Sequence, residues 1–361
     1  MAPGSGALTH GAESAGPADL GVRNRWKELR YRFEWFAVWL LTKIVPLLPR
    51  LAAYCAAQFF GALAAHLDRH GRKVALANLA SAFGDQMSLQ ARKRIVRESY
   101  QHFARTMIDL FWSPRLTEKN FQRWIEFDYA EWARVGIAPG DSFVLGTYHY
   151  GNFEWFSLAS GFLRFNGTII TQEFKNALLD PIFKNLRELS GHQMVAREGG
   201  VVRLYKNVRR GSIAAILIDL TIPAKTPSVA INCFGLKTNV TYAHAWLHKK
   251  TGKPLITAHA EPLPRGRYRM VLHRPEFSSD ASLQQIAQAC WDAFEPHVRA
   301  NPAPWLWMYK HWRYRPGSEP REQYPFYANF SEDFEVRLEE SGFPSVLPEN
   351  AATVANGIID K

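Results

Sequence analysis

The segment S-F-V-L-G-T-Y-H-Y-G-N-F-E-W, residues 142–155, decides the fold class of this chain. Residues 142–147 form a short, mostly apolar run of the length typical of a buried strand. Gly151 and Asn152 then supply a turn and a helix cap. The segment therefore predicts a strand, a turn and the start of a helix.

The same alternation extends over residues 126–316. Short apolar runs bounded by Gly, Pro or Asp recur there between helix-like stretches; after residues 142–147 they are residues 168–171, 212–218, 254–258 and 268–272. Strands that alternate with helices are typical of a mostly parallel sheet. We therefore predict one α/β domain over residues 126–316, with a mostly parallel central sheet flanked by helices.

Residues 23–125 are predicted to form an N-terminal helical region. In residues 91–112, apolar side chains recur at helical spacing, with Ser88 as a cap ahead of them. Residues 33–67 are strongly apolar and contain two uncharged runs, residues 35–42 and 51–67. The first run is too short to cross a bilayer, and the second lies at the short limit.

Basic residues flank residues 33–67 on both sides, so a single span would place one basic cluster on the disfavoured side of a membrane. This pattern favours a membrane anchor that lies in plane or forms a shallow hairpin. A buried core hairpin is the alternative.

Composition excludes several classes of protein. Of 361 residues, 47% are hydrophobic and 21% charged, which excludes disorder over the whole length. Three isolated cysteines, Cys55, Cys233 and Cys290, exclude a disulfide scaffold and a thiolate zinc site, and favour a reducing compartment. Residues 1–22 are predicted to be a flexible leader, without the features of a secretory signal.

The net charge of +11 is unevenly distributed. Residues 317–361 contain nine acidic and three basic residues, so this tail carries −6 and residues 1–316 carry +17. We predict an acidic, irregular tail. The basic body favours an anionic partner, which could be a nucleic acid, an anionic membrane or an acidic carrier protein.

His149 and Glu154 are the first candidate catalytic pair. On one continuous helix their side chains would point about 140° apart, so they can meet only if His149 lies in the turn and Glu154 in the first helical turn. The carboxylate would then orient the imidazole, which would take a proton from an attacking hydroxyl. Backbone N–H groups beyond Asn152 would stabilise an oxyanion. The alternative is a structural histidine.

Asp219 directly follows residues 212–218, so it and His149 are expected at the same carboxyl edge of the sheet, where α/β proteins bind ligands. Arg187 lies in the helix-like residues 181–189 and could reach that edge to bind phosphate bidentately. A solvated helical arginine is the alternative reading.

Other patterns are less specific. His244 and His248 are four residues apart but lack a third ligand, so no metal site is predicted. There is no nucleophile elbow and no Walker-type phosphate loop. The aromatic and basic residues 305–316, W-L-W-M-Y-K-H-W-R-Y-R-P, are predicted either to stack on bases or to lie at a lipid headgroup layer.

Several blocks together resemble the bacterial lipid A biosynthesis acyltransferases, within the lysophospholipid acyltransferase group. His149 and Glu154 match the H-x-x-x-x-D/E motif of that family. The blocks are R-K-V-A-L-A-N-L-A-S-A-F-G-D (72–85), G-T-Y-H-Y-G-N-F-E (146–154), R-E-G-G-V-V-R-L-Y-K (197–206), C-F-G-L-K-T (233–238) and P-W-L-W-M-Y-K-H-W-R-Y-R-P (304–316).

The resemblance implies a glycerolipid acyltransferase-like fold and an enzyme at the cytoplasmic face of a bacterial inner membrane. It implies transfer of a fatty acyl chain from an acyl thioester, usually of acyl-carrier protein and alternatively of coenzyme A, to a hydroxyl of a lipid A precursor or related glycolipid, without a cofactor. By resemblance His149 is the base and Glu154 its orienting partner, and Arg187 and Asp219 lie near the acceptor site. Asn152 is also predicted to lie at the substrate site. No nucleic-acid partner is expected.

The chain departs from the family pattern where Leu220 follows Asp219 in place of Gln, and at residues 304–305 and 309–311. These departures leave open another acceptor, such as a lysophospholipid or an aminolipid. The rival classes are a lipid-binding homologue without catalysis and a basic nucleic-acid-binding protein.

Overall fold

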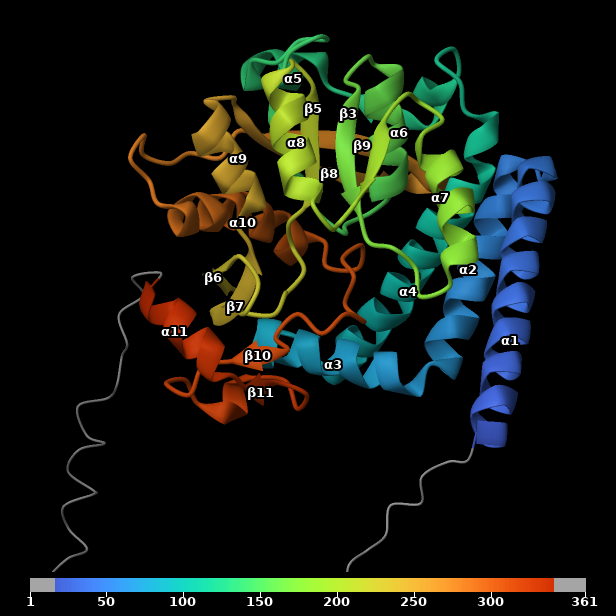
Figure 1. The fold of residues 1–361 in the computed structure, drawn as a ribbon, viewed down its shortest axis with the longest axis horizontal. Helices are drawn as coiled ribbons and strands as arrows, with labels where there is room; N and C mark the ends of the chain where they lie inside the picture. The colour runs from blue at the N-terminus through green and yellow to red at the C-terminus, as the bar shows by residue number, and fades with distance from the viewer. Residues whose placement is uncertain (1–16, 341–361) are drawn as a thin grey trace, which may run out of the picture.

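The computed structural model describes residues 17–340, with side chains described from Arg25 onward (Figure 1). A seven-stranded sheet lies at its centre. Its strands, in spatial order, are β1 (Ile125–Phe127), β9 (Arg267–His273), β8 (Leu255–Leu263), β2 (Val144–Thr147), β5 (Ile213–Leu217), β3 (Gly167–Thr171) and β4 (Gln193–Ala196). All neighbours are parallel except β8 and β9.

The predicted mostly parallel α/β sheet is confirmed, and each of the five predicted apolar runs overlaps a strand of this sheet. Strand β9 runs antiparallel to β8 because only the short turn Pro264–Gly266 separates the two strands. A connection of that length can join antiparallel strands but is too short for a parallel crossover.

Helices cover both faces of the sheet (Figure 1). Adjacent strand residues point to opposite sides: Ala214 packs in one hydrophobic cluster with α8, α9 and α10, and Ala215 packs in the other with α6 and α7. Burial on both faces is the usual condition of a parallel sheet. These helices are α6 (Phe153–Phe162), α7 (Asp180–Arg187), α8 (Gly200–Arg209), α9 (Ala243–Thr251) and α10 (Leu283–Ala300), with α5 (Tyr129–Val135) after β1.

The N-terminal region is helical, as predicted, with α1 (Pro17–Ile44), α2 (Arg50–Leu67), α3 (Arg69–Phe83) and α4 (Leu89–Trp112). The Ser88 hydroxyl accepts a hydrogen bond from Ala91 N and caps α4. Helix α2 approaches α4 so closely that a Cβ on Gly61 would lie 2.5 Å from the Cα of Gln101. The side chain of Asn176 holds α1 by donating to the carbonyl of Tyr31, at 2.9 Å.

The two apolar runs of residues 33–67 therefore fall in separate helices, α1 and α2, with the break at Val45–Pro49. Among residues 17–340, none of the helices combines the length and hydropathy needed to cross a bilayer.

Beyond Pro316 the structure differs from the predicted irregular tail. Strand β11 (Asn329–Phe330) pairs with β10 (Tyr314–Arg315), and α11 (Glu332–Glu340) buries Phe334 and Leu338 against Ala224 and Ala230. The prediction is wrong for these residues because two apolar side chains at helical spacing suffice to anchor an otherwise acidic helix. Ala230 lies on β6 (Ser228–Cys233), which forms a hairpin with β7 (Leu236–Thr241). Residues 341–361, and most of the predicted leader, lie outside the described residues.

Candidate active site

The turn after β2 places His149 at the carboxyl edge of the sheet. Gly151 has φ +58°, and a Cβ there would lie 1.8 Å from the carbonyl oxygen of Ala260, so only glycine allows the turn to press against β8. Asn152 then caps α6, because its Oδ1 accepts a hydrogen bond from Trp155 N at 2.9 Å. The strand, turn and cap predicted from residues 142–155 are confirmed.

The carboxylate that contacts His149 is Asp219. Nδ1 of His149 lies 2.8 Å from Oδ1 of Asp219, and the backbone N–H of His149 donates to Oδ2 at 2.9 Å. Both residues follow paired parallel strands, since Thr147 of β2 is in register with Leu217 of β5. The expectation that His149 and Asp219 share one sheet edge is therefore confirmed.

Asp219 is held as a buried anion. Burial would raise the pKa of its carboxyl, but the imidazole of His149 and the hydrogen bonds from His149 and Trp305 outweigh burial, so the pKa lies below the ordinary value. Nε1 of Trp305 donates to Oδ2 at 2.9 Å. The side chain of Asp219 is fully buried, whereas that of His149 keeps 14% of its surface exposed.

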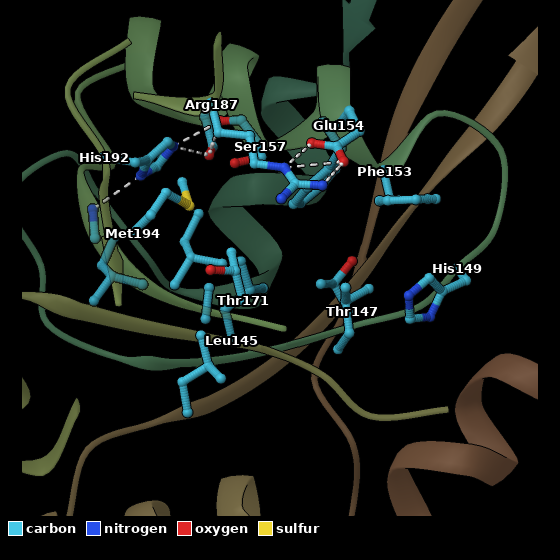
Figure 2. A pocket seen from close by; sticks show the side chains of 18 of the residues that line it. Leu145, Thr147, His149, Phe153, Glu154, Ser157, Thr171, Arg187, His192 and Met194 are labelled. Carbon is cyan, nitrogen blue, oxygen red and sulfur yellow. Dashed lines mark hydrogen bonds and ion pairs between the residues drawn. The ribbon is translucent and has the colours of Figure 1, made fainter. Parts of the chain in front are cut away.

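Glu154 pairs with Arg187 instead of His149. Its carboxylate accepts hydrogen bonds from Nε and Nη2 of Arg187, the shortest at 2.6 Å. Figure 2 shows this pair side by side, with His149 apart from both. The predicted contact between His149 and Glu154 is wrong: the imidazole turns towards β5, and the first turn of α6 directs Glu154 towards α7.

A cavity of about 420 Å³ lies between α6 and the face of the sheet. His149, Glu154 and Arg187 line it, and the rest of its wall is mainly apolar, with Leu145 of β2 and Ala215 of β5 on the sheet side. Its volume is within the range of ligand sites, and an apolar wall with a few polar groups is their usual composition. One nitrogen of His149 is engaged by Asp219; Nε2 makes no hydrogen bond with the part of the chain that is described.

Two cavity residues were not singled out from the sequence. The hydroxyls of Thr147 and Ser157 are buried in the wall without a hydrogen-bond partner among the described residues. Isolated hydroxyl residues carry no spacing signal, so only the assembled cavity reveals them.

Asn152, which was assigned to the substrate site, is not among the residues that line the cavity. Its side chain is fully buried, and Nδ2 donates to Oδ2 of Asp109 at 2.8 Å. Asp109 also pairs with Arg50 of α2 and accepts a hydrogen bond from the Tyr268 hydroxyl at 2.9 Å. Asn152 is thus a helix cap within a buried network that joins α2, α4, α6 and β9.

The aromatic residues 305–316 also differ from their prediction. Trp305, Trp307 and Trp312 are buried, with at most 1% of their surface exposed, and His311 stacks on Trp305 at 3.9 Å between ring centroids. Neither base stacking nor a headgroup contact is open to these three indoles. Their contribution to the site is the hydrogen bond from Trp305 to Asp219.

Comparison with known proteins found one family and one relative that are similar to this chain. The model of a family described as bacterial lipid A biosynthesis acyltransferase matches residues 22–314. The chain is also similar to a protein of Haemophilus influenzae named lipid A biosynthesis acyltransferase, with 25% identity over 264 residues, which cover 70% of this chain and 79% of the relative.

Proposed function

This chain belongs to the bacterial lipid A biosynthesis acyltransferase family, and from that premise we propose the reaction and the roles of its residues. A fatty acyl chain moves from an acyl thioester, with acyl-carrier protein as the expected donor, to a hydroxyl of a lipid A precursor. The observation that carries the proposal is that His149, which lines an apolar cavity, is paired with the buried carboxylate of Asp219.

In this proposal His149 is the general base. Nδ1–H donates to the Asp219 carboxylate, so the lone pair of Nε2 is free to accept the proton of the acceptor hydroxyl. The oxygen attacks the thioester carbonyl, and the C–S bond breaks as the tetrahedral intermediate collapses. The departing thiolate takes the proton back from Nε2 of His149, which restores the starting state.

Asp219 replaces Glu154 as the orienting carboxylate. It fixes the Nδ1–H tautomer and stabilises the imidazolium that forms during attack, as the aspartate does in a hydrolase triad. Because Asp219 is buried and already accepts from Trp305 and the His149 backbone, it holds one position throughout.

The start of α6 supplies donors for the developing oxyanion. The backbone N–H groups of Phe153 and Glu154 form no hydrogen bond within residues 17–340, and both follow His149 closely. Because helix N-termini stabilise negative charge, these two N–H groups would stabilise the oxyanion that forms on the thioester carbonyl.

Glu154 and Arg187 are proposed to bind the acceptor. Burial would lower the pKa of Arg187, but the charge of Glu154 more than offsets it and keeps the guanidinium charged. The contacts with Glu154 use Nε and Nη2, which leaves Nη1 to donate to a phosphate of the acceptor.

We also propose that α1 and α2 seat the enzyme on the cytoplasmic face of the inner membrane. Phe33, Leu47, Leu51 and Phe59 are each more than 60% exposed, which is unusual for side chains of this size. With basic residues near both ends of this region, such a surface fits the interface of an anionic bilayer.

An assay with purified full-length protein tests the chemistry. Wild type should transfer a labelled acyl chain from acyl-carrier protein to a lipid A precursor in mixed micelles, and His149→Ala should be inactive while its circular dichroism is unchanged. Equal turnover by His149→Ala would defeat the role of the base. Transfer to a lysophospholipid but not to the lipid A precursor would defeat the proposed acceptor.

Vesicle sedimentation tests the membrane surface. The double variant Phe33→Ser/Phe59→Ser should bind phosphatidylglycerol vesicles at least tenfold more weakly than wild type. The control Val336→Ser, which changes a 53% exposed apolar side chain on α11, should bind as wild type does. If Val336→Ser weakened vesicle binding as much as Phe33→Ser/Phe59→Ser does, the proposal that α1 and α2 form the membrane surface would be contradicted.

A further inference from the structure

Three histidines meet on the face of the sheet opposite to the cavity. They are His259 of β8, His273 of β9 and His297 of α10, and each offers a ring nitrogen within 4.8 Å of the other two. In the register of the antiparallel pair, Thr257 opposes His273 and His259 opposes Val271, so the two histidines are diagonal neighbours on one face.

Helix α10 brings the third imidazole. Phe294 packs against this face, and His297 follows three residues later on the same side of the helix. The ring centroid of His297 lies 4.6 Å from that of His259 and 4.7 Å from that of His273. The cluster therefore joins three separate segments of the chain.

Glu261 completes the cluster with a carboxylate. It is two residues after His259 on β8 and so points to the same face. Its Oε1 lies 3.4 Å from Nδ1 of His297 and 3.8 Å from Nε2 of His259. These separations are too long for strong hydrogen bonds, but they bring an oxygen ligand beside the three nitrogens.

His259 is the member of this cluster that is most deeply buried without hydrogen bonds to its ring. Its side chain has no exposed surface, and neither of its ring nitrogens has a hydrogen-bond partner among the described residues. A buried polar group without a partner is costly, so such a group is informative about a missing ligand.

We propose that His259, His273, His297 and Glu261 bind one divalent transition-metal ion of the zinc class, which fastens α10 to β8 and β9. Three imidazole nitrogens and one carboxylate oxygen make a four-coordinate set of the kind that Zn²⁺ prefers. With bonds of about 2.1 Å, the edges of such a tetrahedron are about 3.4 Å long. One nitrogen of each histidine already lies within 4.8 Å of the other two, and the Glu261 oxygen lies within 3.8 Å of His259 and His297, so small side-chain movements reach that spacing.

An ion has a route to this site. The side chains of Glu261 and His297 are about one-third exposed, at 32% and 30%. Glu261 also lines an open groove with Glu126, Asp128 and Glu131, which Arg269 borders. The predominance of carboxylates there favours the approach of a cation.

The site would support the turn that carries the catalytic base. The ring of Tyr150, the neighbour of His149, lies edge-on to His259 at 5.2 Å. The metal is thus a structural element behind the active site, and its presence is testable without an activity measurement.

The test uses untagged full-length protein, stripped with a chelator and titrated with ZnCl₂ or CoCl₂. We expect one zinc per chain by mass spectrometry of the metal, visible absorption bands of four-coordinate cobalt, and a higher midpoint of thermal unfolding with zinc. His273→Ala and His297→Ala should each bind zinc at least tenfold more weakly. The controls His66→Ala and His70→Ala, which change exposed histidines, should bind as wild type does.

Both ligand variants change partly exposed side chains, so their stripped forms should unfold at the wild-type temperature. Absence of bound zinc in wild type at excess metal would overturn the proposal and leave a histidine cluster that binds no metal. Equal zinc affinity in His297→Ala and His66→Ala would also overturn it, because the ion would then lie elsewhere.

Discussion

The substitution Asp219→Asn is expected to stop acyl transfer without unfolding the chain. Oδ2 of Asp219 accepts two hydrogen bonds at 2.9 Å, from the backbone N–H of His149 and from Nε1 of Trp305. Oδ1 faces Nδ1 of His149 at 2.8 Å. An asparagine must place its carbonyl oxygen at the Oδ2 position, because an amide nitrogen there would face two donors. Its NH₂ group then faces Nδ1.

The amide therefore reverses the tautomer of His149. An NH₂ group only donates, so Nδ1 becomes the acceptor and the proton moves to Nε2, which can no longer act as a base. The equivalent change in a serine protease triad lowers kcat by about 10⁴-fold. General-base catalysis contributes about 10²–10⁴-fold in other enzymes. We therefore expect kcat to fall by about 10³–10⁴-fold, which corresponds to about 4–5.5 kcal/mol in the activation free energy.

The assay is single-turnover acyl transfer from labelled acyl-carrier protein to a lipid A precursor, with protein in excess. Trp305→Phe serves as the matched variant, because it removes one donor to Oδ2 and leaves the Nδ1–Oδ1 contact in place. It should lower the rate by less than tenfold. If Asp219→Asn retained more than a tenth of the wild-type rate, the reasoning about the tautomer would be refuted.

Three further substitutions test the Glu154–Arg187 pair, the cavity and the buried His244. Glu154→Gln should lower the free energy of unfolding by about 2 kcal/mol and reduce acyl transfer, because Arg187 loses its charged partner; unchanged stability by thermal unfolding would contradict this. Ala215→Leu should shift the preference for donors to shorter acyl chains in competition assays, because the larger side chain on β5 fills part of the cavity. An unchanged preference would show that this cavity does not bind the acyl chain. Burial lowers the pKa of His244 to about 3, so the unfolded state binds more protons between pH 3 and 6.5. Wild-type stability should therefore fall as pH drops below 6.5, with His244 contributing up to about 1.4 kcal/mol per unit. The stability of His244→Leu, measured by thermal unfolding between pH 7.5 and 5, should fall less steeply than that of wild type. Parallel curves of stability against pH for the two proteins would show that His244 does not cause this pH dependence.

The local geometry of the site was predictable from sequence. Residues 142–155 specify a strand, a turn and a cap through apolar periodicity, Gly151 and Asn152, and these signals act over a few residues. The position of Asp219 was predictable too, because parallel strands align their carboxyl ends.

The partners of these side chains were not predictable in the same way. Glu154 is paired by Arg187, 33 residues later on a different helix, so the choice depends on how α6 packs against α7. The volume of the cavity depends on side chains from five strands and from helices α4–α7, and no spacing in the sequence encodes their combined size. Likewise, the polar and basic residues between the tryptophans of residues 305–316 suggested a surface, while the fold buries the indoles.

The histidine cluster shows the same limit. His259, His273 and His297 are separated by 14 and 24 residues in the chain and have no metal-binding spacing. They meet only because a tight turn joins β8 to β9 and α10 crosses the resulting face.

Mass spectrometry of lipid A shows whether this chain transfers an acyl group with His149 as the base. Lipid A is extracted from bacterial cells that lack this activity and produce either the wild-type chain or His149→Ala at equal levels. We expect that wild type adds the mass of one fatty acyl group, bound as an ester, and that His149→Ala adds none. The same added mass with both proteins, or with neither, would contradict this expectation.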